Sequence, residues 1–148
     1  MTINVFRHCE TRFYCIYTPD SPMNNPSVLL VCTSCGGNAE SDRQGKVRDG
    51  ARLFDQLQTL HQDLPLRDDV EIRPVKCMGV CDRPCIIAFV GSGKFTYLFG
   101  GLQADDRQTA SDILIGANQY AHHPDGILAY RERPDRLRDT IIAKIPTV

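Results

Sequence analysis

The chain has 148 residues, a length that suits one compact domain with a core of its own. Hydrophobic residues make up 42% and charged residues 24%, and the formal net charge of -1 gives no general attraction to nucleic acid or membrane. No apolar run approaches the length of a membrane span, and residues 1–26 lack the apolar region of a secretory signal. The composition predicts a cytoplasmic protein with no nucleic-acid and no membrane partner.

Cysteine is unusually frequent, with seven residues. In a reducing cytoplasm, clustered thiols are more often metal ligands or redox groups than disulfides. Three of them, Cys77, Cys81 and Cys85, lie within nine residues, and Cys32 and Cys35 form a second local pair. These five thiols are the candidates for a metal site.

Residues 1–27 differ from the rest of the chain because turn and breaker residues are dense there. This pattern indicates an N-terminal extension, followed by one domain at residues 28–148. Cys9 and Cys15 lie in the extension, where we expect ordinary thiols. The alternative is an extension that folds over the metal site and shields it or supplies a ligand.

The first predicted elements bring both cysteine groups to the ends of strands. Residues 28–31 form a short apolar run that predicts a buried strand ending at Cys32. Residues 47–64 place apolar side chains at helical spacing, and residues 70–76 alternate as in a half-buried strand that ends at Cys77.

The second half of the chain predicts a hairpin followed by helices. Residues 86–90 and 94–99 flank Gly91-Ser92-Gly93, which favours a hairpin turn over a phosphate loop. Asp105-Asp106 would cap a helix that stops at His123-Pro124, and residues 134–144 predict a short C-terminal helix. The predicted fold class is α/β (α+β), with a mixed four-stranded sheet. Along the chain, the elements follow the order β-α-β-β-β-α, and the short C-terminal helix comes last.

Strand ends that lie side by side would bring the thiols together. Neighbouring strands place their ends a few ångströms apart, so Cys32, Cys35, Cys77 and Cys81 are the candidate ligands. Zinc sites usually have a two-residue gap in both pairs, so the three-residue gap from Cys77 to Cys81 favours a [2Fe–2S] cluster over zinc. Gly79 lets the backbone approach sulfide, and N–H groups of this loop can bond to sulfur.

Several stretches resemble a known family. Residues 31–35, 77–85, 93–102, 124–126 and 131–134 resemble an uncharacterised bacterial family of predicted metal-binding proteins. That family is similar to the thioredoxin-like [2Fe–2S] ferredoxins and to the small ferredoxin subunit of respiratory complex I. The resemblance covers about residues 28–146 and implies a thioredoxin-like fold, a [2Fe–2S] cluster and often a homodimer. Some members are associated with cobalamin or cobalt handling.

The chain departs from the ferredoxin pattern at two places. The first two ligands of such ferredoxins are usually farther apart than Cys32 and Cys35, and a proline is common where this chain has Cys85. Either Cys35 or Cys85 could therefore be the fourth ligand, and Cys85 could also be an exchangeable fifth thiol.

The cysteine pattern is compatible with three functions. The first is a small electron carrier that serves a redox partner protein, and not a stand-alone enzyme, because no acid–base or nucleophilic group accompanies the thiols. The second is a metal-binding or metallochaperone module for zinc or cofactor delivery. The third is a thiol–disulfide oxidoreductase using Cys32 and Cys35, disfavoured because the next helix begins only near Val47.

A histidine pair and a C-terminal basic run are two further features, and we expect both to be structural rather than functional. His122-His123 ends a helix, where the dipole favours histidine, and adjacent helical residues do not share a face as a metal pair would. The C-terminal basic run is expected to be a solvated face, with docking of an acidic redox partner as the alternative. Its members are Arg131, Arg133, Arg136 and Arg138.

Overall fold

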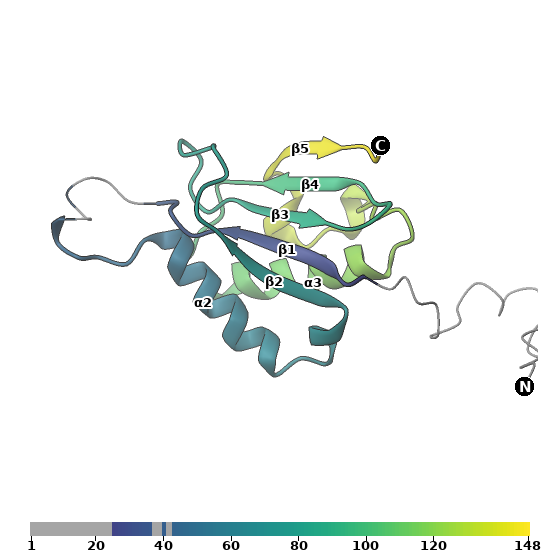
Figure 1. Ribbon diagram of the computed structural model, residues 1–148, viewed down its shortest axis with the longest axis horizontal. Helices are drawn as coiled ribbons and strands as arrows, with labels where there is room; N and C mark the ends of the chain where they lie inside the picture. The colour runs from purple at the N-terminus through teal and green to yellow at the C-terminus, as the bar shows by residue number, and fades with distance from the viewer. Residues whose placement is uncertain (1–24, 37–39, 41–42) are drawn as a thin grey trace, which may run out of the picture.

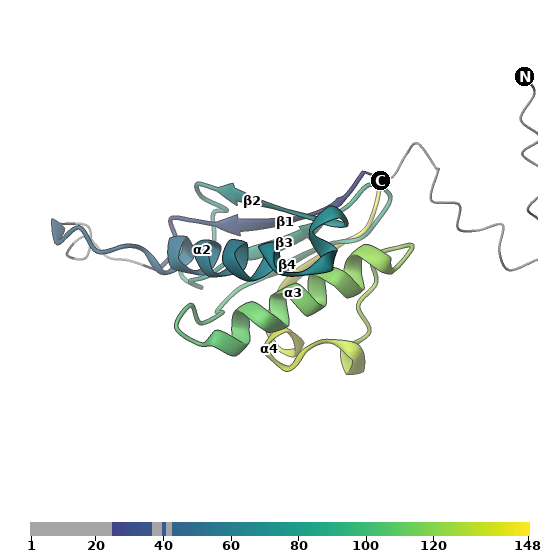
Figure 2. The same ribbon diagram turned by 90° about the horizontal axis from the view of Figure 1, so that it is seen from below.

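The computed structural model describes residues 25–36, 40 and 43–148, so Cys9 and Cys15 lie outside the described residues. A five-stranded sheet forms one layer, and helices α2 and α3 lie together on one of its faces (Figures 1 and 2). The strands are β1 Ser27–Cys32, β2 Val70–Val75, β3 Ile87–Val90, β4 Thr96–Phe99 and β5 Ile141–Ile145. The helices are α2 Asp49–Gln62, α3 Arg107–His122 and α4 Asp135–Arg138, with 3₁₀ turns at Pro65–Asp68 and Tyr130–Glu132.

The sheet has the strand order β2-β1-β3-β4-β5. β1 and β2 are parallel and are joined through α2, whereas β3 is antiparallel to both β1 and β4. This order and direction of the first four strands is that of a thioredoxin-like sheet. The predicted mixed, thioredoxin-like α+β fold is therefore confirmed.

The main core lies between the sheet and the two long helices. Alternate residues of each strand point to this face because the side-chain period of a strand is two. From the sheet come Leu29, Val31, Phe89, Tyr97 and Phe99, and from the helices Leu53, Leu57, Ile113 and Leu114. The rings of Phe89 and Phe99 lie 5.1 Å apart, a tilted packing typical of aromatic pairs.

The opposite face of the sheet carries a second apolar row. Leu30 pairs with Ala88, Ala88 with Leu98, and Leu98 with Ala143, so four strands contribute one side chain each. Ala88 is buried, and Leu30, Leu98 and Ala143 are partly buried. α2 and α3 lie on the other side of the sheet (Figure 2).

The predicted C-terminal helix over residues 134–144 is present only as the short helix α4, and the prediction is wrong for the residues that follow it. α4 ends at Arg138, and β5 pairs antiparallel with β4, which makes the sheet five-stranded rather than four-stranded. The apolar residues Leu137, Ile141 and Ile145 fit a helical spacing, but β-branched isoleucines also suit a strand. The unpaired edge of β4 decides between helix and strand. This edge is formed by residues distant in the sequence from β5.

The local signals of the hairpin and of α3 are confirmed. Lys94 N donates to Gly91 O across the predicted turn, and the Lys94 ammonium donates to the carbonyls of Tyr120 and Ala121 at the end of α3. Asp106 is the N-cap of α3 and accepts from the backbone N–H of Gln108 at 2.9 Å.

The two histidines at the end of α3 make local contacts and do not form a metal pair with each other. His122 Nδ1 contacts Asn118 O, whereas His123 Nδ1 accepts from the backbone N–H groups of Asp125 and Ile127. These Nδ1 atoms stabilise the helix end and the turn after it, while His122 Nε2 lies 3.7 Å from Asp69. None of the helices in the described part of the chain is long and apolar enough to cross a membrane.

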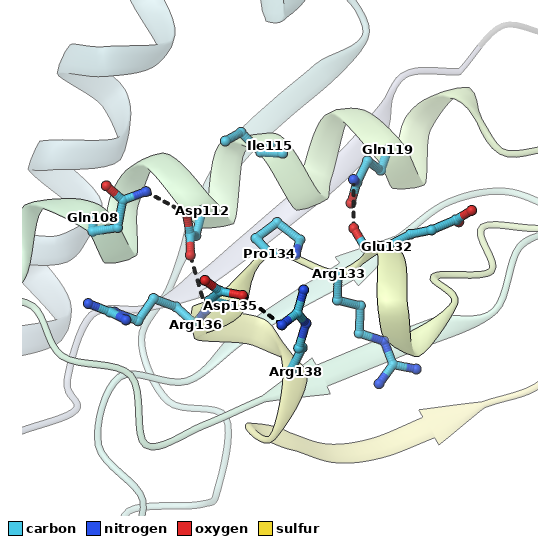
Figure 3. A pocket seen from close by; sticks show the side chains of 10 residues that line it. All are labelled: Gln108, Asp112, Ile115, Gln119, Glu132, Arg133, Pro134, Asp135, Arg136 and Arg138. Carbon is cyan, nitrogen blue, oxygen red and sulfur yellow. Dashed lines mark hydrogen bonds and ion pairs between the residues drawn. The ribbon is translucent and has the colours of Figure 1, made fainter.

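The C-terminal arginines pack against the molecule through their own partners. Arg133 donates to Leu128 O, Arg136 pairs with Asp106 at 2.7 Å, and Arg138 pairs with Asp135 at 2.8 Å. Figure 3 shows the last of these pairs at the pocket between α3 and the segment that contains α4. Two of the four arginines, Arg136 and Arg138, are therefore paired with carboxylates.

Candidate metal centre

The ends of β1 and β2 lie side by side and bring the two cysteine groups to one end of the sheet. Cys32 is in register with Val75, and Thr33 N donates to Val75 O at 2.8 Å. Cys77 follows Val75 by two residues, and the Cys32 thiol lies 4.0 Å from the carbonyl oxygen of Lys76. The predicted meeting of two strand ends is thus observed in the backbone.

Cys32 and Cys35 form a buried inner pair whose thiols are hydrogen-bonded to each other. Burial acts to raise the pKa of Cys32, but hydrogen bonds from the Cys35 thiol, the Met78 amide and Ser34 together lower it below its usual value. Burial, and then the same contact with Cys32, raises the pKa of Cys35 to about 12. The contact between the two thiols thus shifts their pKa values in opposite directions.

The N-terminus of α2 packs directly on the loop of the inner pair. Gly50 N donates to Cys35 O at 3.0 Å, and Asp49 N donates to Gly36 O at 3.1 Å. A Cβ atom on Gly50 would lie 2.0 Å from Cys32 O, so only glycine fits there. Arg48 adds a side-chain hydrogen bond to Ser34 O. α2 begins at Asp49, close to the predicted start near Val47. The residues between Cys35 and α2 do not keep the helix away from the loop that carries the thiols.

Sequence reasoning missed the structural roles of Gly50 and Arg48. Glycine in the first turn of a helix is unfavourable by roughly 1 kcal/mol relative to alanine, which is a signal that something approaches closely. The sequence cannot show that this neighbour is the carbonyl of Cys32. That contact is formed only when β1 and α2 pack together.

Cys77 and Cys81 form an exposed outer pair. Gly79 lies between them with φ +80°, a left-handed conformation that favours glycine, and its N–H donates to Cys77 Sγ at 3.4 Å. The predicted backbone hydrogen bond to sulfur is therefore present. A hydrogen bond to Cys77 is the largest cause that raises the pKa of Cys81, and the charge of Cys32 adds to it. Cys81 is thus in contact with Cys77 and within electrostatic reach of the inner pair.

Cys85 lies apart from the outer pair, in the core between sheet and helices. Its side chain is 2% exposed, and its thiol interacts with the backbone N–H of Ala104. Burial, and after it the negative charge of Asp49, raises the pKa of Cys85 to about 11. The charge of Cys85 is also a minor influence that raises the pKa of Cys35.

The thiols thus occur as two contacting pairs. Among the residues that the structure describes, no three histidine, cysteine or acidic side chains gather as ligands around one point. A tetrahedral zinc needs four ligands around one ion, whereas a [2Fe–2S] cluster takes two thiolates at each of two irons. Two pairs of thiols are the donor set that such a cluster would need.

These observations define a small thioredoxin-like protein with paired cysteines at the ends of its two parallel strands. The model of the family described as "Protein of unknown function (DUF1636)" matches residues 29–147, and the chain belongs to this family. Membership of an uncharacterised family, expected from the sequence, is thereby confirmed.

Among solved structures, the chain is similar to a thioredoxin-like [2Fe–2S] ferredoxin from Aquifex aeolicus, with 17% sequence identity and a TM-score of 0.48. The similarity covers 81% of this chain and 93% of that one. No curated protein matches the chain.

Proposed function

We propose that the protein is a small electron carrier that holds one [2Fe–2S] cluster on Cys32, Cys35, Cys77 and Cys81. The arrangement of the thiols as a buried pair and an exposed pair, each in internal contact, is the observation that carries this proposal. It provides two thiolates for each of two irons. Cys85 is left out of the ligand set because its thiol lies in the helix-side core.

The chain's own residues would determine how such a site exchanges electrons. A bound [2Fe–2S] cluster supplies one-electron chemistry. The inner pair is buried against Ile86, whereas the outer pair lies at the surface, so a redox partner protein would approach the outer pair. The Gly79 N–H stabilises negative charge on Cys77 sulfur. The chain is in this proposal a carrier and not a stand-alone catalyst.

Metal content of cysteine variants tests the proposal and the ligand set together. The protein is purified without oxygen, and iron, acid-labile sulfide and zinc are measured for the wild type and for Cys→Ser variants at all seven positions. We expect about two irons and two sulfides per chain. Substitution of Cys32, Cys35, Cys77 or Cys81 should remove most of this iron, and substitution of Cys85 should not. A colourless protein with stoichiometric zinc would contradict the proposal.

A metal-binding or metallochaperone module is the second candidate, and the exposure of the outer pair favours it. Cys77 and Cys81 are accessible, as ligands that hand over a metal must be. A delivery protein should lose its zinc or cofactor to a chelator within minutes and show no reversible one-electron reduction. An electron carrier should keep its iron under the same treatment and be reduced and reoxidised reversibly.

We also propose a homodimer formed through the face of the sheet opposite the helices. The row Leu30, Ala88, Leu98 and Ala143 gives this face an apolar centre, and Leu98 also packs against the cluster that contains Cys32 and Cys35. Leu98→Glu should convert dimers to monomers in sedimentation experiments. Ile115→Glu, at an exposed position of α3 on the helix side, is the matched control and should not. A wild type that sediments as a monomer would contradict this proposal.

A further inference from the structure

Basic side chains frame the end of the sheet where the thiols lie. Lys76 directly precedes Cys77, and Arg83 follows Cys81 by two residues; both are exposed. Arg48 reaches the inner pair's loop through its hydrogen bond to Ser34 O at 2.9 Å, and the exposed Lys46 lies two residues before it. We call Lys46, Arg48, Lys76 and Arg83 the basic rim.

Main-chain contacts place Lys76 beside the Cys32 sulfur and Arg83 in the loop of the outer pair. The Cys32 thiol donates to Lys76 O, and Arg83 N donates to Val80 O within the loop of the outer pair. Figure 1 shows the loop between β2 and β3 at the same end of the sheet as the segment that leads into α2. Lys76 and Arg83 are therefore exposed basic residues on the segment that carries the outer pair, and Lys46 and Arg48 belong to the segment that leads into α2.

Little negative charge in the described residues opposes the rim. Asp82 is the acidic residue of the loop, and Asp49 is paired with Arg52. Within the described part of the chain, the ion pairs that form use Arg52, Arg73, His122, Arg136 and Arg138, and none uses Lys46, Lys76 or Arg83. Because the whole chain has a net charge of -1, an excess of positive charge here implies an excess of negative charge elsewhere.

We infer that the basic rim is a docking surface for a protein whose own redox centre is surrounded by carboxylates. This inference deepens the proposed function and rests on it, because it places the partner at the exposed pair Cys77 and Cys81. Complementary charge raises the association rate and orients the partner, while contributing less to affinity at high salt. In the exchange, one electron leaves the reduced cluster and enters the oxidised partner, and no bond is formed or broken. Arg136 and Arg138 of the C-terminal basic run are paired with Asp106 and Asp135 and are not this surface.

Binding of an acidic peptide tests the rim without requiring electron transfer. The probe is a fluorescently labelled polyglutamate peptide, titrated with the purified holoprotein at low and at physiological salt. We expect binding at low salt that weakens as salt is added, and Lys76→Glu or Arg83→Glu should weaken it by about threefold or more. Arg131→Glu, an exposed charge reversal in the turn Tyr130–Glu132, is the matched control and should have little effect.

Two results of the binding experiment would overturn the inference. One is equal weakening by Arg131→Glu and by the rim variants, because this would show only an effect of total charge. The other is tighter binding of a single-stranded oligonucleotide of the same net charge, because this would assign the rim to nucleic acid. Peptide binding through Lys76 and Arg83 by a chain that lacks iron and sulfide would contradict the proposed function while supporting the rim.

Oxidation by small reagents of opposite charge is the second measurement. The reduced holoprotein is mixed with ferricyanide, an anion, or with hexaamminecobalt(III), a cation, over a series of salt concentrations. A positive rim predicts that the ferricyanide rate falls as salt increases and that the cobalt rate does not. Lys76→Glu and Arg83→Glu should flatten the ferricyanide dependence. A ferricyanide rate that rises with salt in the wild type would overturn the inference.

Discussion

Among the described residues, Cys85 is the only residue other than glycine with a left-handed backbone, at φ +58°. This conformation costs an L-residue roughly 1–2 kcal/mol. It directs the Cys85 side chain into the core between sheet and helices, while Cys77 and Cys81 stay at the surface. The two neighbouring contacts Gly101 N to Pro84 O and Cys32 N to Ile86 O hold the chain on either side of it.

Two substitutions separate the packing of Cys85 from its backbone conformation. Cys85→Ala keeps the left-handed strain and removes a buried sulfur, so we expect a loss of about 1–2 kcal/mol in the free energy of unfolding. Cys85→Gly removes more buried surface but relieves the strain, so it should be at least as stable as the alanine variant. Urea unfolding measures both. A glycine variant clearly less stable than the alanine variant would contradict the strain argument.

At the scale of elements, α4 and β5 are held to the molecule by a close contact between Leu137 and α3. Leu137 is fully buried, and its Cδ1 atom lies 2.5 Å from the position that a Cβ on Gly116 would take. Gly116 therefore provides the space into which Leu137 packs. This contact, together with pairing to β4, keeps the C-terminal segment from continuing as a helix.

A double-mutant cycle tests that contact. Leu137→Ala should cost about 2–5 kcal/mol because it leaves a cavity. Gly116→Ala alone should also destabilise, since the new methyl group meets Leu137. In the Leu137→Ala background the same methyl group has room, and alanine favours a helix by about 1 kcal/mol over glycine. The double variant should therefore be more stable than Leu137→Ala alone, as measured by urea unfolding. Additive losses would show that the two residues do not share this space.

For the whole molecule, Lys94 joins the hairpin, β1 and α3. Its ammonium donates to Tyr120 O, Ala121 O and Ser27 Oγ, and it lies 5.3 Å from the centre of the Tyr120 ring. Burial lowers the pKa of Lys94 below its usual value of 10.5. The sequence Gly91-Ser-Gly-Lys94 thus serves the fold rather than a phosphate.

Lys94→Met should lower the free energy of unfolding by about 1–3 kcal/mol at neutral pH, because charge-assisted hydrogen bonds are lost. The pH dependence has a definite sign. Between the lowered folded pKa and 10.5, the unfolded chain binds more protons at this site than the folded chain, so the contribution of Lys94 to stability rises with pH. Unfolding at several alkaline pH values should show the gap between wild type and variant widening. A gap that narrows would contradict the lowered pKa.

Much of the fold was predictable because its signals are local. The alternation of residues 70–75, the helical spacing after Asp49, the glycines at 91 and 93 and the cap at Asp106 each act within a few residues. The pairing of β5 with β4 was not predictable in this way, since Ile141 and Ile145 suit helix and strand alike. Its outcome depends on a strand edge formed some forty residues earlier in the chain.

The same distinction between local signals and contacts of distant segments applies to the candidate site. The amino-acid sequence by itself determined which thiols lie at the ends of strands, and that Gly79 would turn the outer loop so that an N–H reaches sulfur, because both follow from short-range spacing. Only the tertiary structure decided that the α2 N-terminus packs on Cys32 and Cys35 and that Cys85 faces the core. These outcomes depend on packing between distant segments, which no local pattern of residues specifies.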